Sequence, residues 1–181
     1  MKKLTAAFVL LLAVCAARAE NQPYIRAMFG LADAMQGSYR DYNLRGAPLM
    51  SSSDSVTPTF SAALGVKFES NVAVEAEIYT LAGVTQRWIP DEHAGLTAYT
   101  VNASEFFPFR EKGKLNPFIG AGLGVMNSTF FLARNNALAF TAFVGSHVGR
   151  ATVFRLKYLV GKTYGSAHNI FALEAGYRFN L

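Results

Sequence analysis

Paired carboxylates are the first residues in this sequence that could do chemistry. Glu75 and Glu77 are two residues apart, a spacing that places both side chains on one face of a β-strand. Two carboxylates on one face can serve as acid and base in glycoside hydrolysis. Cations occupy equivalent positions in other segments, so ion pairing is the simpler interpretation. The predicted charge network consists of Arg26, Lys67, Glu75, Glu77, Arg155, Lys157, Glu174 and Arg178.

A glycine pattern could indicate a nucleotide cofactor and the histidines could indicate a metal, but neither has the spacing that such a site needs. Gly120, Gly122 and Gly124 follow a G-x-G-x-G spacing with no helical pattern after it, whereas dinucleotide sites need G-x-G-x-x-G before a helix. The histidines, at positions 93, 147 and 168, have no metal-site spacing. We therefore predict no cofactor and no metal, and we expect the glycines to make room for bulky side chains inside a sheet.

The start of the chain has the form of a secretory signal. Lys2 and Lys3 precede an uncharged run of 14 residues that ends at Arg18. Such a run is too short for a transmembrane helix, which needs about 20 residues. It fits the apolar core of a signal peptide, and the A-x-A sequence ending at Ala19 is a cleavage site. We expect residues 1–19 to be the signal and residues 20–181 to be one domain.

Processing changes two other inferences. Three cations leave with the signal, which lowers the formal net charge from +5 to +2, so we predict no nucleic-acid partner. The only cysteine, Cys15, also lies in the signal. Cleavage before Cys15 with acylation is the alternative, although Val14 is a poor residue at that cleavage position. The exported chain then needs no disulfide.

The remaining sequence consists of eight segments of period two, separated by turn residues. One face of each segment is aliphatic or aromatic, and the other carries charged, hydroxyl or glycine residues. The predicted strands are 24–32, 59–68, 72–81, 96–106, 117–125, 138–148, 152–160 and 169–181.

These faces predict an all-β, closed, antiparallel eight-stranded transmembrane barrel. The apolar face includes many rings, and an eight-stranded lumen is too narrow to hold them. In lipid they fit without crowding, and closure removes strand edges that lipid could not solvate. The charges then fill the lumen as a plug. A narrow pore and a soluble lipocalin-like carrier are the alternatives.

The connections alternate in length, as expected for short periplasmic turns and longer outer loops. Residues 69–71, 107–116 and 149–151 would be periplasmic, together with both termini. Residues 33–57, 82–95, 126–137 and 161–168 would be external. Aromatic residues near segment ends would form interfacial girdles. We expect Phe106, Phe107, Phe109 and Phe118 at the periplasmic rim, and Trp88, Phe130 and Phe131 at the outer rim.

Two segments resemble a known family. Residues 116–125, NPFIGAGLGV, are similar to the Pro-aromatic-x-Gly-x-Gly-x-Gly strand of small outer-membrane barrels such as the OmpA transmembrane domain and opacity-type surface proteins. The last strand resembles the signal read by the barrel-assembly machinery, although this chain ends in Asn180 and Leu181. The residues that would carry this signal are Phe171, Leu173, Tyr177 and Phe179.

The resemblance implies a monomeric protein of the bacterial outer membrane, in contact with lipid and lipopolysaccharide, with a structural, adhesive or protective role. Some small barrels are lipid A deacylases that use Ser and His on a late strand. Ser166 and His168 offer those groups, but their order differs from the His-x-Ser-Asn pattern, and no acid is spaced to orient the histidine. A lipid A hydrolase is therefore the alternative to a non-enzymatic protein.

Binding would fall to the loops. Tyr, Trp and Arg are the side chains that most often anchor interfaces. The first long loop holds Tyr39, Arg40 and Tyr42, and the second holds Arg87 and Trp88. Aromatics at the membrane rim are the competing interpretation. We predict a non-enzymatic barrel that displays these two loops to an extracellular ligand.

Overall fold

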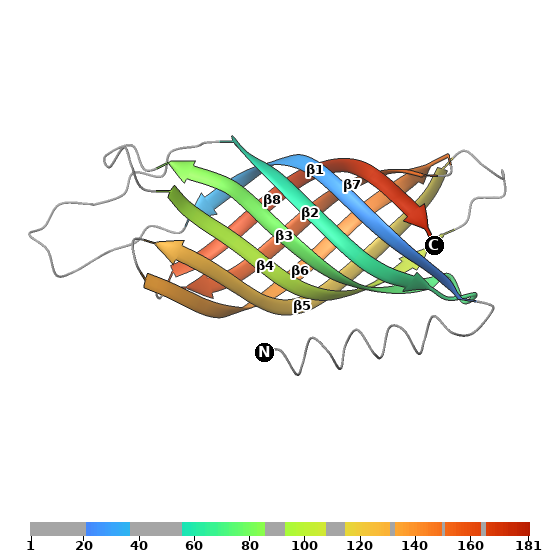
Figure 1. Ribbon diagram of the computed structural model, residues 1–181, viewed down its shortest axis with the longest axis horizontal. Coiled ribbons are helices and arrows are strands. Elements are labelled where there is room, and N and C mark those ends of the chain that lie inside the picture. Colours follow the sequence, from blue (N-terminus) through green and yellow to red (C-terminus); the bar gives the residue numbers. More distant parts are fainter. Residues whose placement is uncertain are drawn as a thin grey trace, which may run out of the picture.

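The computed structural model describes residues 21–36, 56–85, 93–107, 115–130, 133–149, 151–163 and 166–181. The described residues form eight β-strands (Figure 1). Their bounds are β1 Gln22–Gln36, β2 Val56–Lys67, β3 Val72–Thr85, β4 His93–Phe106, β5 Leu115–Phe130, β6 Ala133–Val148, β7 Thr152–Thr163 and β8 Ser166–Asn180. No helix within these ranges is long and apolar enough to cross a membrane.

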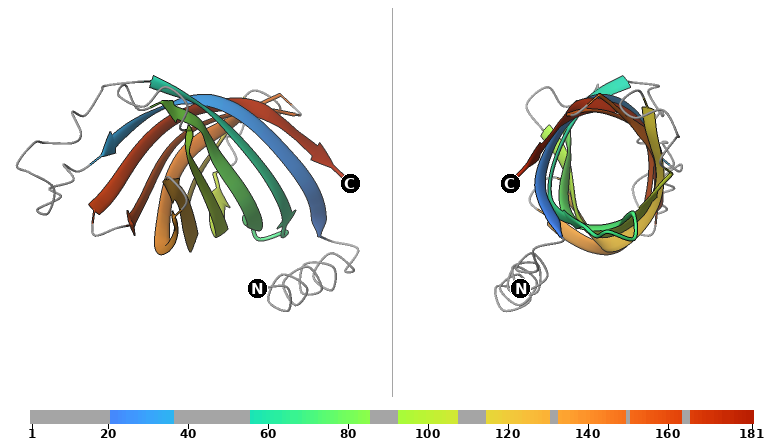
Figure 2. Two further views of the ribbon diagram at one scale, coloured as in Figure 1. Left: turned by 60° about the vertical axis from the view of Figure 1, so that its left-hand side comes forward. Right: turned by 90° about the vertical axis from the view of Figure 1, so that its right-hand side faces the viewer.

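The strands close into one antiparallel barrel in chain order. Each strand pairs with the next, and β1 pairs with β8 from Tyr24↔Asn180 to Gln36↔His168. Seen along its axis, the barrel is a continuous ring with β1 and β8 side by side (Figure 2). The predicted fold class is confirmed.

The two ends of the barrel differ. At one end, Phe68 donates its backbone N–H to the Val72 carbonyl at 2.8 Å, and Asn71 takes a left-handed conformation with φ 61°. Gly149, with φ 67°, starts the turn between β6 and β7 at the same end. Leu181 bonds there to the Pro23 carbonyl, so β1 begins where β8 ends. We call this the turn end, and the opposite end the loop end.

All eight predicted strands are present, but several extend further toward the loop end. The clearest case is the predicted loop 126–137, which is wrong: β5 and β6 pair from Leu115↔Val148 to Phe130↔Ala133. The side chains of Asn127 and Asn136 bond to each other at 2.9 Å within this extension. Polar residues suggested a loop because strand propensity disfavours asparagine, but cross-strand pairing continues through them.

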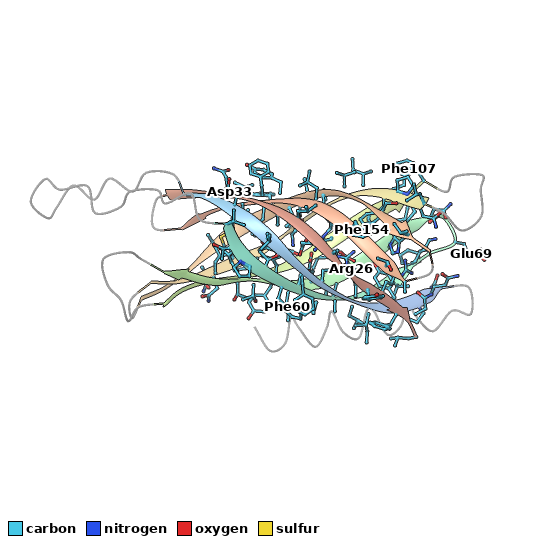
Figure 3. All side chains as sticks on the ribbon, turned by 90° about the horizontal axis from the view of Figure 1, so that it is seen from above. Arg26, Asp33, Phe60, Glu69, Phe107 and Phe154 are labelled. Carbon is cyan, nitrogen blue, oxygen red and sulfur yellow. The ribbon has the colours of Figure 1, made fainter. Side chains whose placement is uncertain are left out.

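The alternation of faces follows the prediction. Apolar side chains point outward and are exposed, as for Phe29 at 67% and Leu173 at 65%. In Figure 3, Phe60 projects from the outside of the barrel, whereas Arg26 lies within it. The strands therefore turn their apolar faces away from the enclosed space.

Two of the predicted rim aromatics are misplaced. Phe106 and Phe118 are only 7% and 1% exposed, because they share the inward face with Ser104 and Gly120. Phe107, on the opposite face, is 47% exposed. Phe109, Trp88 and Phe131 lie outside the described residues, and the side chain of Phe130 is not described.

Candidate functional site: the filled lumen

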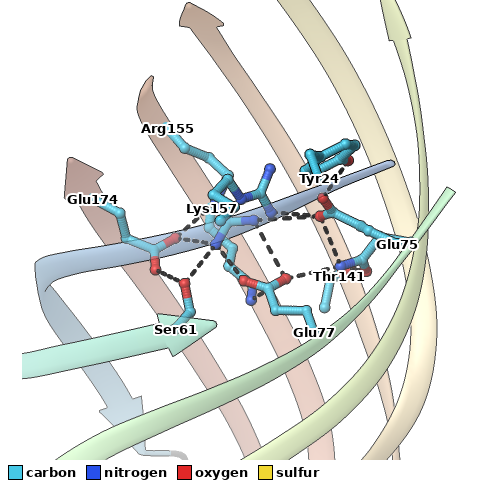
Figure 4. A network of polar contacts seen from close by, with 10 residues as sticks. Tyr24, Ser61, Glu75, Glu77, Thr141, Arg155, Lys157 and Glu174 are labelled. Atoms are coloured by element: carbon cyan, nitrogen blue, oxygen red, sulfur yellow. Dashed lines mark hydrogen bonds and ion pairs between the residues drawn. The ribbon is translucent and has the colours of Figure 1, made fainter. Parts of the chain in front are cut away.

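The lumen contains a charge network at its centre (Figure 4). The structure brings together six of the eight predicted charges, which come from β1, β3, β7 and β8. They are Arg26, Glu75, Glu77, Arg155, Lys157 and Glu174. Three cations therefore face three carboxylates, a balance that a buried cluster of charges requires.

Arg155 is the centre of this network and is 1% exposed. Its Nε donates to Glu174 Oε2 at 2.8 Å, and its Nη1 donates to Glu77 Oε2 at 3.3 Å. Its Nη2 bonds to Glu77 Oε1 and lies 2.6 Å from Glu174 Oε2. One guanidinium on β7 thus joins carboxylates of β3 and β8.

Two further pairs complete the charge balance. Arg26 Nη2 bonds to Glu75 Oε1, and the Tyr24 hydroxyl donates to Glu75 Oε2 at 2.9 Å. Lys157 Nζ lies 3.1 Å from Glu77 Oε2 and 4.2 Å from the ring centroid of Tyr79. Each carboxylate of the network accepts from more than one group, which orients it in the barrel.

Neutral side chains connect the network to the remaining strands. Asn102 of β4 donates to Glu77 at 2.8 Å and accepts from Thr141 of β6 at 2.9 Å, and Ser61 of β2 donates to Glu174 at 3.0 Å. On β5, a Cβ at Gly122 would lie 2.0 Å from Asn102 Oδ1 and 2.4 Å from the Val101 carbonyl. The glycine is needed so that Asn102 can reach Glu77.

An apolar layer fills the lumen toward the loop end. Its residues are all buried and come from seven strands: Ala32, Tyr79, Leu81, Leu96, Ala98, Met126, Ala139, Leu159, Ile170 and Ala172. The lumen therefore holds an apolar layer beside the predicted charges. The period of two places Leu81 and Leu159 on the inner faces of the predicted strands 72–81 and 152–160, and continuing it one residue past 117–125 places Met126 there as well.

A third layer, at the turn end, combines rings with cations. Its buried apolar members include Tyr24, Phe106, Phe118 and Phe143. His147 lies between Phe106 and Phe118, with its ring centroid 5.4 Å from each. Lys67 and Arg178, the other two predicted charges, lie in this layer and not in the central network.

The other candidate residues fall outside what is described. Ser166 and His168 belong to β8, but their side chains are not described. The predicted loop residues lie wholly outside the described ranges; they are Tyr39, Arg40, Tyr42, Arg87 and Trp88. Within the described ranges, no cluster of three or more His, Cys, Asp or Glu could hold a metal ion.

Comparison with known proteins identifies the architecture. No protein-family model and no curated protein matches the sequence. Among solved structures, Neisserial surface protein A aligns over 88% of this chain and 97% of its own, with TM-score 0.59 and 14% identity. The chain has the fold of the small eight-stranded outer-membrane barrels. The predicted resemblance is thereby confirmed at the level of the fold.

Two other barrels match over similar lengths. One is Ail of Yersinia pestis, in complex with the heparin analogue sucrose octasulfate, with TM-score 0.50 and 18% identity. The alignment covers 88% of this chain and 99% of the Ail chain. The N-terminal barrel domain of Pseudomonas aeruginosa OprF has TM-score 0.50 and 13% identity, with coverage of 87% and 97%.

Removing the central cation tests the network. Arg155→Met should destabilise the barrel by about 3–5 kcal/mol, because it leaves Glu77 and Glu174 buried without their main partner. Thr141→Val removes only a neutral hydrogen bond and should cost about 1 kcal/mol. Urea unfolding in detergent micelles, followed by the loss of β-sheet signal in far-UV circular dichroism, measures both. Equal stability of Arg155→Met and the wild type would contradict the role assigned to Arg155.

Proposed function

We propose that the protein spans the bacterial outer membrane as a plugged, non-enzymatic barrel and displays its long loops at the cell surface. The observation that carries this proposal is the combination of an apolar exterior with a lumen filled by a charge network and two covering layers. A soluble carrier would need the reverse arrangement. Ion-paired lumen carboxylates also leave no open site for glycosidase chemistry.

The height of the apolar exterior supports membrane insertion. Every outward residue of β5 from Leu115 to Val125 is aliphatic or aromatic, and so is every outward residue from Phe171 of β8 to Leu181, which directly follows the strand. Both stretches span ten residue steps. At about 3.4 Å per residue and a tilt of about 40°, each covers about 26 Å. Outer-membrane barrels carry an apolar band of about 25 Å.

Polar pairs lie immediately beyond this band at the loop end. Asn127 bonds to Asn136 on the exterior, and the Tyr158 hydroxyl donates to Asn169 Oδ1 at 2.7 Å. Asn127 follows the apolar stretch of β5 and Asn169 precedes that of β8, so each lies one outward position beyond its stretch on the loop-end side. Asparagine and tyrosine suit the headgroup region, where a polar group can reach water.

The orientation is proposed from the connections. The turn end, with the tight 68–71 connection and both described chain ends, would face the periplasm. Residues 37–55 and 86–92 would then be external. The exposed Phe171, Leu173, Tyr177 and Phe179 would meet the assembly machinery and later lipid and lipopolysaccharide. A closed barrel has no free edge, so a monomer suffices.

A charge on the exterior tests membrane insertion. Ala121→Arg, near the middle of the apolar stretch of β5, should destabilise the barrel in lipid vesicles by about 2–4 kcal/mol. Asn127→Arg, on the same strand and face but beyond the stretch, should cost about 0–1 kcal/mol. Urea titration of the vesicle-bound protein, with the heat-modifiable band on a gel as the folding signal, compares them. Equal costs would exclude insertion at this depth.

The filled lumen gives a second test. We expect no protein-dependent current steps in planar bilayers. Ion pairs fill the centre of the lumen, and the apolar layer excludes water from the lumen on the loop-end side. A larger porin reconstituted in the same bilayers is the positive control. Reproducible steps whose frequency follows the amount of protein would establish the narrow pore instead.

Loop deletions test the display function. Immobilised heparin is the first probe, because the similar barrel Ail was crystallised with a heparin analogue. Replacing residues 38–53 by a Gly-Ser linker removes Arg40, Arg45 and Asp41, a net loss of one positive charge, and should reduce heparin retention at least fivefold. Replacing residues 87–91 removes Arg87 together with Asp91, so it leaves the net charge unchanged and serves as the smaller control deletion. Retention that neither deletion alters would contradict loop-mediated binding.

The lipid A hydrolase needs its own assay. Release of acyl chains from lipid A by the wild type, lost in Ser166→Ala, would replace the non-enzymatic proposal. The display proposal expects no release by either protein.

A further inference from the structure

Two lumen cations lack the counter-charges that the central network supplies. Lys67 and Arg178 lie in the turn-end layer, apart from the three cations that face Glu75, Glu77 and Glu174. Neither forms an ion pair with any carboxylate of the described residues. Among the described residues, the turn-end layer of the lumen therefore carries two cations that no carboxylate pairs with.

Aromatic rings take the place of carboxylates around these cations. The Arg178 guanidinium carbon lies 3.9 Å from the ring centroid of Tyr24 and 5.9 Å from that of Phe106. Lys67 Nζ lies 5.0 Å from the centroid of Phe106, so both cations approach the same ring. Cation–π contacts stabilise a charge by less than the cost of burying it.

Arg178 also retains an unused donor. The residue is 8% exposed, and its buried Nε has no hydrogen-bond partner. The Tyr24 hydroxyl does not accept from it in the structure but donates to Glu75. A buried donor without an acceptor is costly. Lys67 is more exposed than Arg178, so the layer is open to solution on the Lys67 side.

We propose that Lys67 and Arg178 form a binding site for a small oxyanion, a carboxylate or a phosphate group, at the turn end of the lumen. Arg178 would supply a planar set of N–H donors, including Nε, and Lys67 would supply a mobile ammonium group. Phe106 and His147 would form the wall of the site. The site would bind its anion whichever compartment the turn end faces and whatever the loops bind.

The test uses the ¹⁵N-labelled protein refolded in uncharged maltoside micelles. Titration with sodium phosphate or sodium acetate, at constant ionic strength set by sodium chloride, should give a saturable shift of the Arg178 Nε–H resonance. Stronger binding of phosphate would point to a phosphate-bearing ligand, and stronger binding of acetate to a carboxylate-bearing one. No saturable shift with either anion would overturn the proposal.

Variants locate the site. Lys67→Gln should weaken binding at least tenfold, as expected for loss of one charged hydrogen-bond donor, whereas Lys67→Arg should retain binding within about threefold. Lys162→Gln removes the same charge from β7 at the loop end and should leave affinity unchanged. Equal weakening by Lys67→Gln and Lys162→Gln would mean general charge attraction and would overturn the site. The heat-modifiable gel shift shows that each variant is folded.

Discussion

The buried guanidinium of Arg155 is the interaction on which the rest of the lumen depends. A charge at this depth is tolerated only when carboxylates surround it, because desolvating an unpaired ion costs several kcal/mol. Its partners, Glu77 and Glu174, stand on β3 and β8, while Arg155 stands on β7. The contact to β3 crosses the barrel between strands that are not neighbours. Pairing of these charges and closure of the barrel are therefore achieved together.

The layers on the two sides of the network, at the loop end and at the turn end, raise the cost of leaving any of its charges unpaired. The apolar layer at the loop end and the aromatic layer at the turn end keep water from the central charges. In such surroundings a matched ion pair is stronger, and an unmatched one is more costly, than in water. The space for the network comes from the opposite wall, where Gly122 allows Asn102 to bridge Glu77 and Thr141.

The sequence was sufficient for the barrel because one signal, the period of two, encodes both strand position and face. It placed all eight strands and the inward direction of Arg155 and Glu77. It could not show that Lys67 and Arg178 stand apart from the other six charges, since that depends on height in the lumen and hence on register between strands. It also misplaced Phe106 and Phe118, because aromatic residues at strand ends were assigned to the membrane rim without regard to their face.

Register is where the lumen charges have their largest effect on folding. A strand that slipped by one residue would turn its whole inner face toward lipid. For β7 that would expose Arg155 and Lys157 to hydrocarbon and bring Phe154 and Leu156 into the charge network. Each exposed cation would cost about 2–4 kcal/mol near the midplane. The charges thus fix the register of β3, β7 and β8 from within the barrel, through contacts between strands that the structure describes.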